Sequence, residues 1–335
     1  MYFLSKIHSA SLKALQVTIL IPFLFILNNA ANAKSDLPHI PPVDVKMSLK
    51  KVSSHVYYAQ GVAGIATDNK GFISNSAVII TDEGIIIFDA LGTPSLAKKL
   101  VSKIREISDK PIKKIFISHY HADHFFGLQG LLTKDVEIYA PAGAQKYLAR
   151  EGAEVRLNER RESLKPWVNK TTKLIPASHY LSEDMVFKFG GLDISVLLFG
   201  SAHSDGDLSL FVKQDEVLIT GDLLFTGRIP FVGGDDVQNW VKKIDELAKY
   251  PAKWIIPGHG AAFKEFEKGS KLTKNYLNLL YTVMTNGVDE LMSFEEIYKN
   301  TDWSEFENLP AFKTGNRINA YRVFLNAEKA ALESQ

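Results

Sequence analysis

The chain has 335 residues, of which 46% are hydrophobic and 23% charged, and its formal net charge is +1. This composition is that of a globular protein with a substantial core, and the near-neutral charge argues against a nucleic-acid partner. The sequence has no cysteine, which excludes disulfides, a lipid-anchoring cysteine and any thiolate ligand or nucleophile.

Residues 1–33 have the pattern of a signal peptide. Lys6 and Lys13 are its only charged residues, and an apolar stretch follows at 14–27. This stretch is shorter than the roughly 20 residues of a membrane-spanning helix, and Ala-Asn-Ala at 31–33 is typical of a cleavage site. We therefore expect export to the periplasm and no stable membrane insertion after cleavage. An uncleaved anchor is the alternative.

Strand and helix patterns alternate after a proline-containing N-terminal arm at 34–50. Strands are predicted at 52–60, 75–81, 85–89, 114–117, 137–140, 185–189, 192–199, 208–212, 217–220 and 253–256, and helices at 93–107, 141–150 and 236–250. This alternation, in two halves over residues 51–264, predicts an α/β fold with helices outside two sheets. Residues 265–335 form a helical extension, with a capping box at Ser293 and Glu296 and a terminal helix at 316–332.

The segment 151–173 is rich in charge and contains Pro166-Trp167. Two interpretations are open for it. It is either a surface insertion near the mouth of a site or a solvated helix.

The densest chemical signal is the stretch Ser118–Gly127, which follows a short buried strand. His119 and His121 are two residues apart, so in extended chain their side chains point to the same side, and Asp123 and His124 follow where the chain turns. Imidazole and carboxylate groups without thiolate suit Zn²⁺ and similar metals, and the spacing suggests two adjacent ions. Surface histidines are the alternative, but imidazoles packed this closely disfavour one another's protonation unless a metal or partner relieves them.

Further potential ligands follow the later strands. His203 comes after the strand at 192–199, Asp222 ends the next hairpin, and His259 follows the strand at 253–256. Asp89 ends the strand at 85–89 and is either a ligand or a carboxylate that orients one. Side chains on loops at strand ends are positioned by rigid elements, where chemistry usually occurs.

Taken together, these motifs resemble the metallo-β-lactamase superfamily over roughly residues 50–262. The resemblance implies a four-layer αβ/βα sandwich with the site in a cleft at one edge of the two sheets. It also implies that one metal is held by His119, His121 and His203, that a second is held by Asp123, His124 and His259, and that Asp222 bridges the two.

The resemblance implies hydrolysis by two Zn²⁺ ions, with Asp123 and Asp222 as catalytic residues. A hydroxide between two cations is a nucleophile at neutral pH, and Asp123 would orient it and take its proton. A structural zinc site is the alternative, but such sites are normally closed, four-coordinate and rich in cysteine.

Asp222 bears on the substrate, because true β-lactamases of this superfamily carry cysteine or serine at that position. The chain therefore looks like glyoxalase II, although only Arg228 matches the basic glutathione-binding segment of that enzyme. The Gly71–Ser76 and Gly221–Phe225 runs look closest to an exported branch found alongside quinoprotein dehydrogenase and sulfur-oxidation systems. We expect a small-molecule substrate with an ester, thioester or lactam-like carbonyl.

Three alternatives remain open at this point. They are a β-lactamase proper, a persulfide dioxygenase that uses one Fe²⁺ with the same ligands, and a non-catalytic metal-binding periplasmic protein.

Arg228 and Phe231 are predicted to line the substrate pocket. Phe125 and Phe126 are also candidates, but packing in the core is the better interpretation for both. Three other histidines lack ligand neighbours and are predicted to have no metal role: His39, His55 and His179. The C-terminal helices either cover the cleft or form a homodimer.

Overall fold

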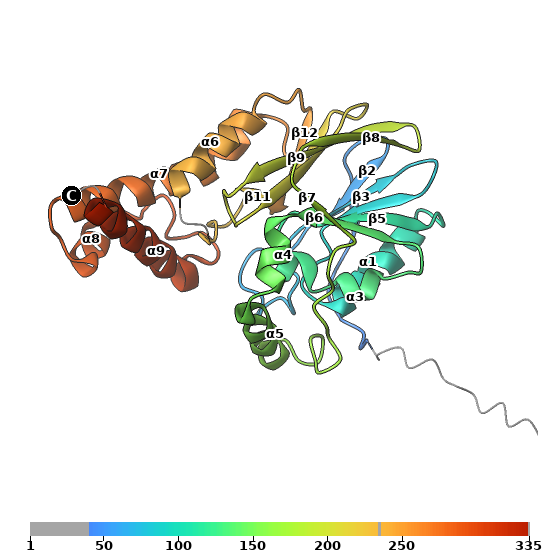
Figure 1. Ribbon diagram of the computed structural model, residues 1–335, viewed down its shortest axis with the longest axis horizontal. Coiled ribbons are helices and arrows are strands. Elements are labelled where there is room, and N and C mark those ends of the chain that lie inside the picture. The colour runs from blue at the N-terminus through green and yellow to red at the C-terminus, as the bar shows by residue number, and fades with distance from the viewer. Residues whose placement is uncertain (1–39, 234–235, 334–335) are drawn as a thin grey trace, which may run out of the picture. The chain divides into compact units, whose positions relative to one another are not determined.

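The computed structural model describes residues 40–233 and 236–333, so the predicted signal peptide at 1–33, and His39 with it, lie outside the described residues. Two sheets form the centre of the fold (Figure 1). The seven-stranded sheet contains, in spatial order, β1 (Leu49–Lys51), β2 (Val56–Ala59), β3 (Ser76–Ile80), β4 (Ile85–Phe88), β5 (Ile112–Phe116), β6 (Glu137–Pro141) and β7 (His179–Leu181). The five-stranded sheet contains β12 (Trp254–His259), β11 (Val217–Phe225), β10 (Asp207–Val212), β9 (Leu192–Gly200) and β8 (Met185–Phe189).

The central strands of the first sheet are apolar because both of their faces are covered. β3 and β4 form an antiparallel hairpin, and β4, β5, β6 and β7 then run parallel. Every residue of β4 is buried, which explains its continuous Ile-Ile-Ile-Phe sequence in place of an alternating one.

Three apolar cores separate four layers. Leu96, Leu100 and Ile104 of α1 (Pro94–Arg105) pack on the outer face of the first sheet. Between the sheets, Ile86 of β4 and Leu210 of β10 belong to one buried apolar cluster. On the far side, helices α6 (Val237–Leu247) and α7 (Phe266–Asp289) pack on the second sheet. The predicted four-layer αβ/βα sandwich with added C-terminal helices is confirmed.

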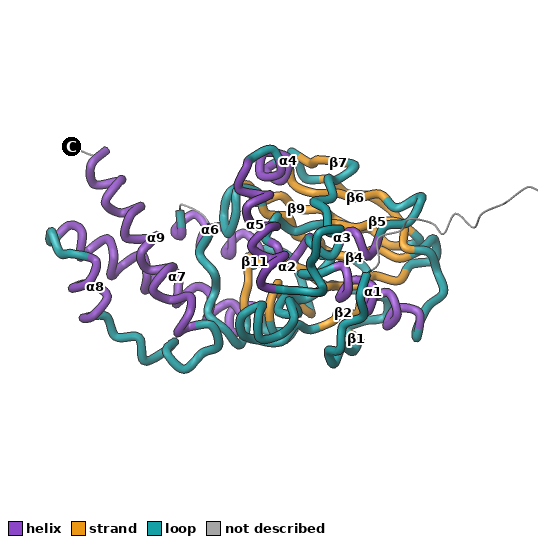
Figure 2. Tube along the Cα trace, turned by 90° about the horizontal axis from the view of Figure 1, so that it is seen from below, coloured by secondary structure: helices purple, strands orange, loops and turns teal. Residues whose placement is uncertain are grey.

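The C-terminal region is helical, as predicted. α7 is followed by α8 (Phe294–Asn300) and α9 (Phe312–Glu333), and the three helices lie together in both views (Figures 1 and 2). The capping box at Ser293 and Glu296 is present at the start of α8. No helix in the described part of the chain combines the length and apolarity needed to cross a bilayer.

The structure extends several elements beyond their predicted ends. β11 continues to Phe225 and β12 to His259, so Asp222 and His259 lie within the last residues of strands instead of after them. Pairing registers shift in these stretches, between Ile219 and Gly221 and again before Phe225. Such irregularities turn side chains out of the normal alternation, which the sequence pattern could not show.

Candidate metal centre

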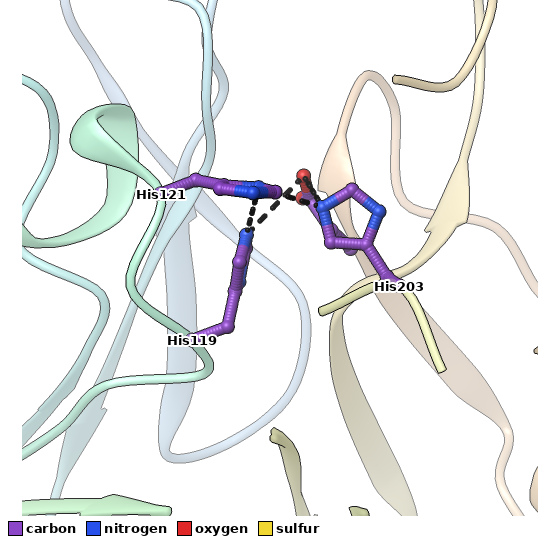
Figure 3. A group of neighbouring side chains, drawn as sticks. His119, His121 and His203 are labelled. Atoms are coloured by element: carbon purple, nitrogen blue, oxygen red, sulfur yellow. Dashed lines mark hydrogen bonds and ion pairs between the residues drawn. The ribbon is translucent and has the colours of Figure 1, made fainter. Parts of the chain in front are cut away.

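The candidate ligands come from the ends of strands in both sheets. His119 and His121 lie in the loop after β5, and Asp123 and His124 lie on α2 (Ala122–Phe125). His203 reaches the same point from the turn between β9 and β10. Figure 3 shows His119 and His121 on one side of the centre, turned toward His203 on the other.

The first group of potential ligands is His119, His121, His203 and Asp222. His121 Nδ1 lies 2.9 Å from His119 Nε2 and 2.9 Å from His203 Nε2. Asp222 Oδ2 is 3.3 Å from His203 Nε2 and 3.8 Å from His119 Nε2. Tetrahedral zinc ligands at their usual bond lengths are about 3.3 Å apart, so these spacings suit a single ion.

The second group is Asp123, His124 and His259. His259 Nε2 lies 3.3 Å from Asp123 Oδ2, and His124 Nε2 lies 3.6 Å from the same oxygen. Asp222 also reaches this group, because its Oδ1 is 3.2 Å from His124 and its Oδ2 is 3.3 Å from His259. Asp222 therefore lies between the two groups and has access to both.

Asp89 connects the two groups from behind. His124 Nδ1 donates to Asp89 Oδ2 at 2.7 Å, and the Ser118 hydroxyl donates to the same oxygen at 2.8 Å. Ser118 Oγ in turn lies 2.9 Å from His119 Nδ1, which can then donate to it. Asp89 thereby fixes the ring orientation of one histidine in each group, directly for His124 and through Ser118 for His119.

Asn75 joins the first sheet to the strand that carries His259. Its side-chain amide donates to the carbonyls of Pro257 (2.7 Å) and Gly260 (2.9 Å), and its backbone N–H donates to Gly258 O (2.7 Å). Gly258 is required here, because a Cβ at that position would lie 1.9 Å from Asp222 Oδ1. The sequence marked Asn75 only as part of a family-like run and showed no role for it.

Electrostatics favour the neutral, metal-binding form of the histidines in the first group. Burial lowers the pKa of His119, His121 and His203, that of His121 to about 4, which leaves them as neutral donors. Burial alone would lower the pKa of His124 as well, but the charges of Asp222, Asp89 and Asp123 raise it. In return, the pKa of Asp222 is held well below its usual range, because attraction to His124 and His259 outweighs the effect of burial.

Two buried ligand atoms at this centre have no hydrogen-bond partner among the described residues. They are His124 Nε2 and Asp222 Oδ1. The second nitrogen of His259 is satisfied by the Ile73 carbonyl at 2.8 Å, so its Nε2 is free to face the centre. Buried polar atoms are normally paired, and these residues therefore fit a pair of metal ions.

A cavity of about 300 Å³ opens beside the centre, and Asp123, Asp222 and His259 line it. The predicted pocket residues Arg228 and Phe231 line it too, and the ring centroid of Phe231 is 5.5 Å from that of His121. Phe125 and Phe126 are instead buried in the apolar core that α1 forms with the seven-stranded sheet. Among the other described histidines, His55 pairs with Asp215 and His179 stacks on Tyr139, both away from the centre.

The sequence did not identify two arginines of this cavity. Arg156 and Arg160 lie on α5 (Glu151–Ser163) and line the cavity, as do Ala311 and Ile318 of the C-terminal region. The charged segment is thus a helix at the mouth of the site, and the C-terminal helices border the cleft. The spacing of four residues between the two arginines was the available signal, since it places both on one helix face.

This arrangement is that of a metal-dependent enzyme, and the comparisons give the family. A model of the metallo-beta-lactamase superfamily matches residues 69–259, more than half of the chain, and the chain belongs to that superfamily. It is a metal-dependent hydrolase, like its relatives. Metallo-beta-lactamase IND-1 of Chryseobacterium indologenes is 25% identical over 62% of this chain and 79% of its own length. The probable metallo-hydrolase YqgX of Bacillus subtilis is 28% identical over 56% of this chain and 85% of its own.

Solved structures share the fold. The stereoselective inverting sec-alkylsulfatase Pisa1 from Pseudomonas sp. superposes with a TM-score of 0.65 at 18% identity, over 85% of this chain. The alignment spans only about half of that enzyme, 52% of its chain. A metallo-beta-lactamase from Pontibacter korlensis gives a TM-score of 0.53 at 19% identity, over 70% of this chain and 99% of its own.

Proposed function

We propose that this protein is an exported dinuclear zinc hydrolase that acts on an ester, thioester or lactam-like carbonyl. The observation that carries the proposal is the placement of Asp222 between two groups of three further ligands, beside an open cavity. When bound, a metal pair supplies a water molecule of lowered pKa and a Lewis acid for the carbonyl.

The residues of the chain have distinct roles in this proposal. Asp123 is the more exposed of the two site carboxylates, 16% against 4% for Asp222, so it is the one placed to orient the attacking water and accept its proton. Asp222 holds the two halves of the centre together. Arg228 and Phe231 bound the space in which the substrate carbonyl would lie, and Asp89 keeps His124 and His119 oriented.

The first test is metal content and turnover on one sample. Elemental analysis of the purified protein should give about two zinc ions per chain, with hydrolysis of a thioester or a chromogenic cephalosporin. The ratio of the two activities separates a glyoxalase II-like thioesterase from a β-lactamase. A single iron ion with neither substrate hydrolysed would overturn the proposal in favour of the dioxygenase. Zinc without turnover on any carbonyl substrate would indicate a non-catalytic metal-binding protein.

A variant pair sharpens this test. Asp123→Asn should lower kcat by about 10²- to 10⁴-fold, the usual range for a group that transfers a proton. Asp205→Asn is the matched control, because Asp205 is 59% exposed and pairs with Arg150. Equal activity of the two variants would remove Asp123 from the proposed mechanism.

Export is the second part of the proposal and rests on the pattern of residues 1–33. Expression of the full chain in a Gram-negative host should place the protein in the periplasmic fraction, with a new N-terminus at Lys34. An intact N-terminus in the membrane fraction would show an uncleaved anchor.

A further inference from the structure

Positive charge gathers on the wall of the cavity next to the metal centre. Arg156 and Arg160 approach from α5, and Arg228 approaches from the segment that follows β11. Among the described residues that line the cavity, the only carboxylates are Asp123 and Asp222, both of which belong to the metal groups. A cavity with three guanidinium groups attracts anions, and a metal pair beside it would add to this attraction.

Arg228 is the deepest of the three and has an unmet hydrogen bond. It is only 8% exposed, and its Nε donates to the backbone carbonyl of Ile229 at 3.2 Å. Its Nη1 is buried and has no acceptor among the described residues. A buried donor of a charged group is costly to leave unpaired, and an anionic oxygen in the cavity would satisfy it.

Arg160 lines the same cavity from α5, whereas Arg228 comes from the segment after β11. No hydrogen bond or ion pair within residues 40–233 and 236–333 engages its guanidinium group, although that group is partly buried. Its neighbours differ: Arg156 pairs with Glu159 at 2.9 Å, and Arg161 donates to the Thr172 carbonyl at 2.7 Å. The guanidinium of Arg160 is therefore available to a ligand, whereas those on either side are engaged.

The remainder of the cavity wall is largely apolar and includes Ile65, Ile73, Phe231 and Ile318. We infer that the substrate is an anion with a short apolar part, and that Arg160 and Arg228 hold its charged oxygens from the two sides. A carboxylate, sulfate or phosphate group offers the same recognition chemistry, since each presents several oxygens to a guanidinium fork. This inference rests on the proposed function, because it takes the cavity as the substrate site.

Binding of a matched pair of unreactive probes tests the inference directly. Hexanesulfonate and methyl hexyl sulfone have the same chain and differ in charge. Calorimetric titration of the zinc-loaded full chain should show the sulfonate bound at least about tenfold more tightly, as a charge-assisted hydrogen bond gives. Comparable affinities for the two probes would overturn the inference.

Arginine variants assign that preference to this chain's own residues rather than to the metals. Arg160→Met and Arg228→Met should each weaken sulfonate binding about tenfold and change sulfone binding by less than about twofold. Arg150→Met is the matched control, since Arg150 is exposed, pairs with Asp205 and does not line the cavity. Equal sulfonate affinity of Arg160→Met and Arg150→Met would refute the role of Arg160. Zinc content and circular dichroism of the Arg228 variants show whether they fold. Arg228→Lys keeps the positive charge at this buried position and serves as the conservative variant.

Turnover on the same proteins separates failure of this inference from failure of the proposed function. S-phenyl thioacetate is neutral, whereas S-phenyl monothiosuccinate carries a remote carboxylate. Hydrolysis of both substrates with equal kcat/KM, unchanged by Arg160→Met, would support the proposed hydrolase and refute the anion site. If neither is hydrolysed, the proposed function fails, and the sulfonate titration still decides whether the anion site exists.

Discussion

Asp89 shows how one buried carboxylate organises several ligands. It accepts hydrogen bonds from His124, from the Ser118 hydroxyl and from the Ser118 backbone at 2.7–2.8 Å. Asp89→Asn should weaken zinc binding about 10- to 100-fold, as removal of a carboxylate behind a metal-binding histidine usually does. Competition with a chromophoric chelator measures the change.

Asp215 supplies the control for Asp89. It also accepts from a histidine ring and a backbone N–H, both of His55 at 2.8 Å, but it lies away from the centre. Asp215→Asn should leave zinc affinity within about twofold and lower only the free energy of unfolding, by about 1–3 kcal/mol. Equal loss of zinc affinity in both variants would contradict the role given to Asp89.

A second prediction at the scale of the residue concerns Asp207 and the pH dependence of stability. Burial raises its pKa to about 7, although Ser204 and the Ala202 N–H stabilise the carboxylate. Because the folded state holds this proton more tightly than the unfolded chain, its contribution to stability is full below the usual aspartate pKa near 4. That contribution is lost as the pH rises toward 7. In the metal-free protein, Asp207→Asn should flatten the decline in unfolding free energy over this range. An unchanged slope would show that Asp207 does not titrate there.

At the scale of elements, α9 holds the segment that carries Arg228 and Phe231. Asn319 of α9 accepts from the Val232 N–H at 3.0 Å and donates to the Pro230 carbonyl at 2.8 Å. Arg322 lies 4.6 Å from the Phe231 ring centroid. The C-terminal helices thus shape the substrate side of the cavity without supplying a candidate metal ligand.

Asn319→Ala should therefore raise KM without changing zinc content. The substitution leaves a buried N–H and a carbonyl unpaired, which should lower the free energy of unfolding by about 1–3 kcal/mol. Asn275→Ala on α7 is the control, because within the described part of the chain the Asn275 side chain hydrogen-bonds only to the exposed side chain of Glu305. Steady-state kinetics and zinc analysis on both variants check the result, and loss of zinc from Asn319→Ala would show that α9 supports the whole centre.

At the scale of the molecule, metal binding should join the two sheets. The first group combines residues from the ends of strands of both sheets, or from the segments that follow them, and so does the second, through His124 and His259. Removal of zinc should therefore lower the Tm of the whole domain. The free energy of unfolding should fall by about 4 kcal/mol for each site at which the free zinc concentration was previously 1,000 times the Kd. Thermal unfolding with and without a chelator measures this, and an unchanged Tm would contradict a metal centre that spans both sheets.

Much of the fold follows from local patterns that tertiary contacts did not override. The all-apolar β4, the α1 helix that starts at the capping residue Thr93, and the capping box of α8 are each encoded within a few residues. The ends of β11 and β12 were predicted several residues too early. Their last residues are shaped by the close approach of Gly258 to Asp222, which no local pattern records.

The same division applies to the site. The sequence yielded all seven candidate ligands. Four of them, at 119–124, are spaced as is typical of metal binding, and the other three, at 203, 222 and 259, followed from their positions at later strand ends and from the family resemblance. Only the tertiary structure decided what surrounds them: Asn75 tied to the His259 strand, Arg160 brought over from α5, and α9 placed against Arg228 and Phe231. Ligand chemistry is a property of residue type and spacing, whereas a cavity wall is built from segments far apart in the chain, whose meeting depends on how all four layers pack.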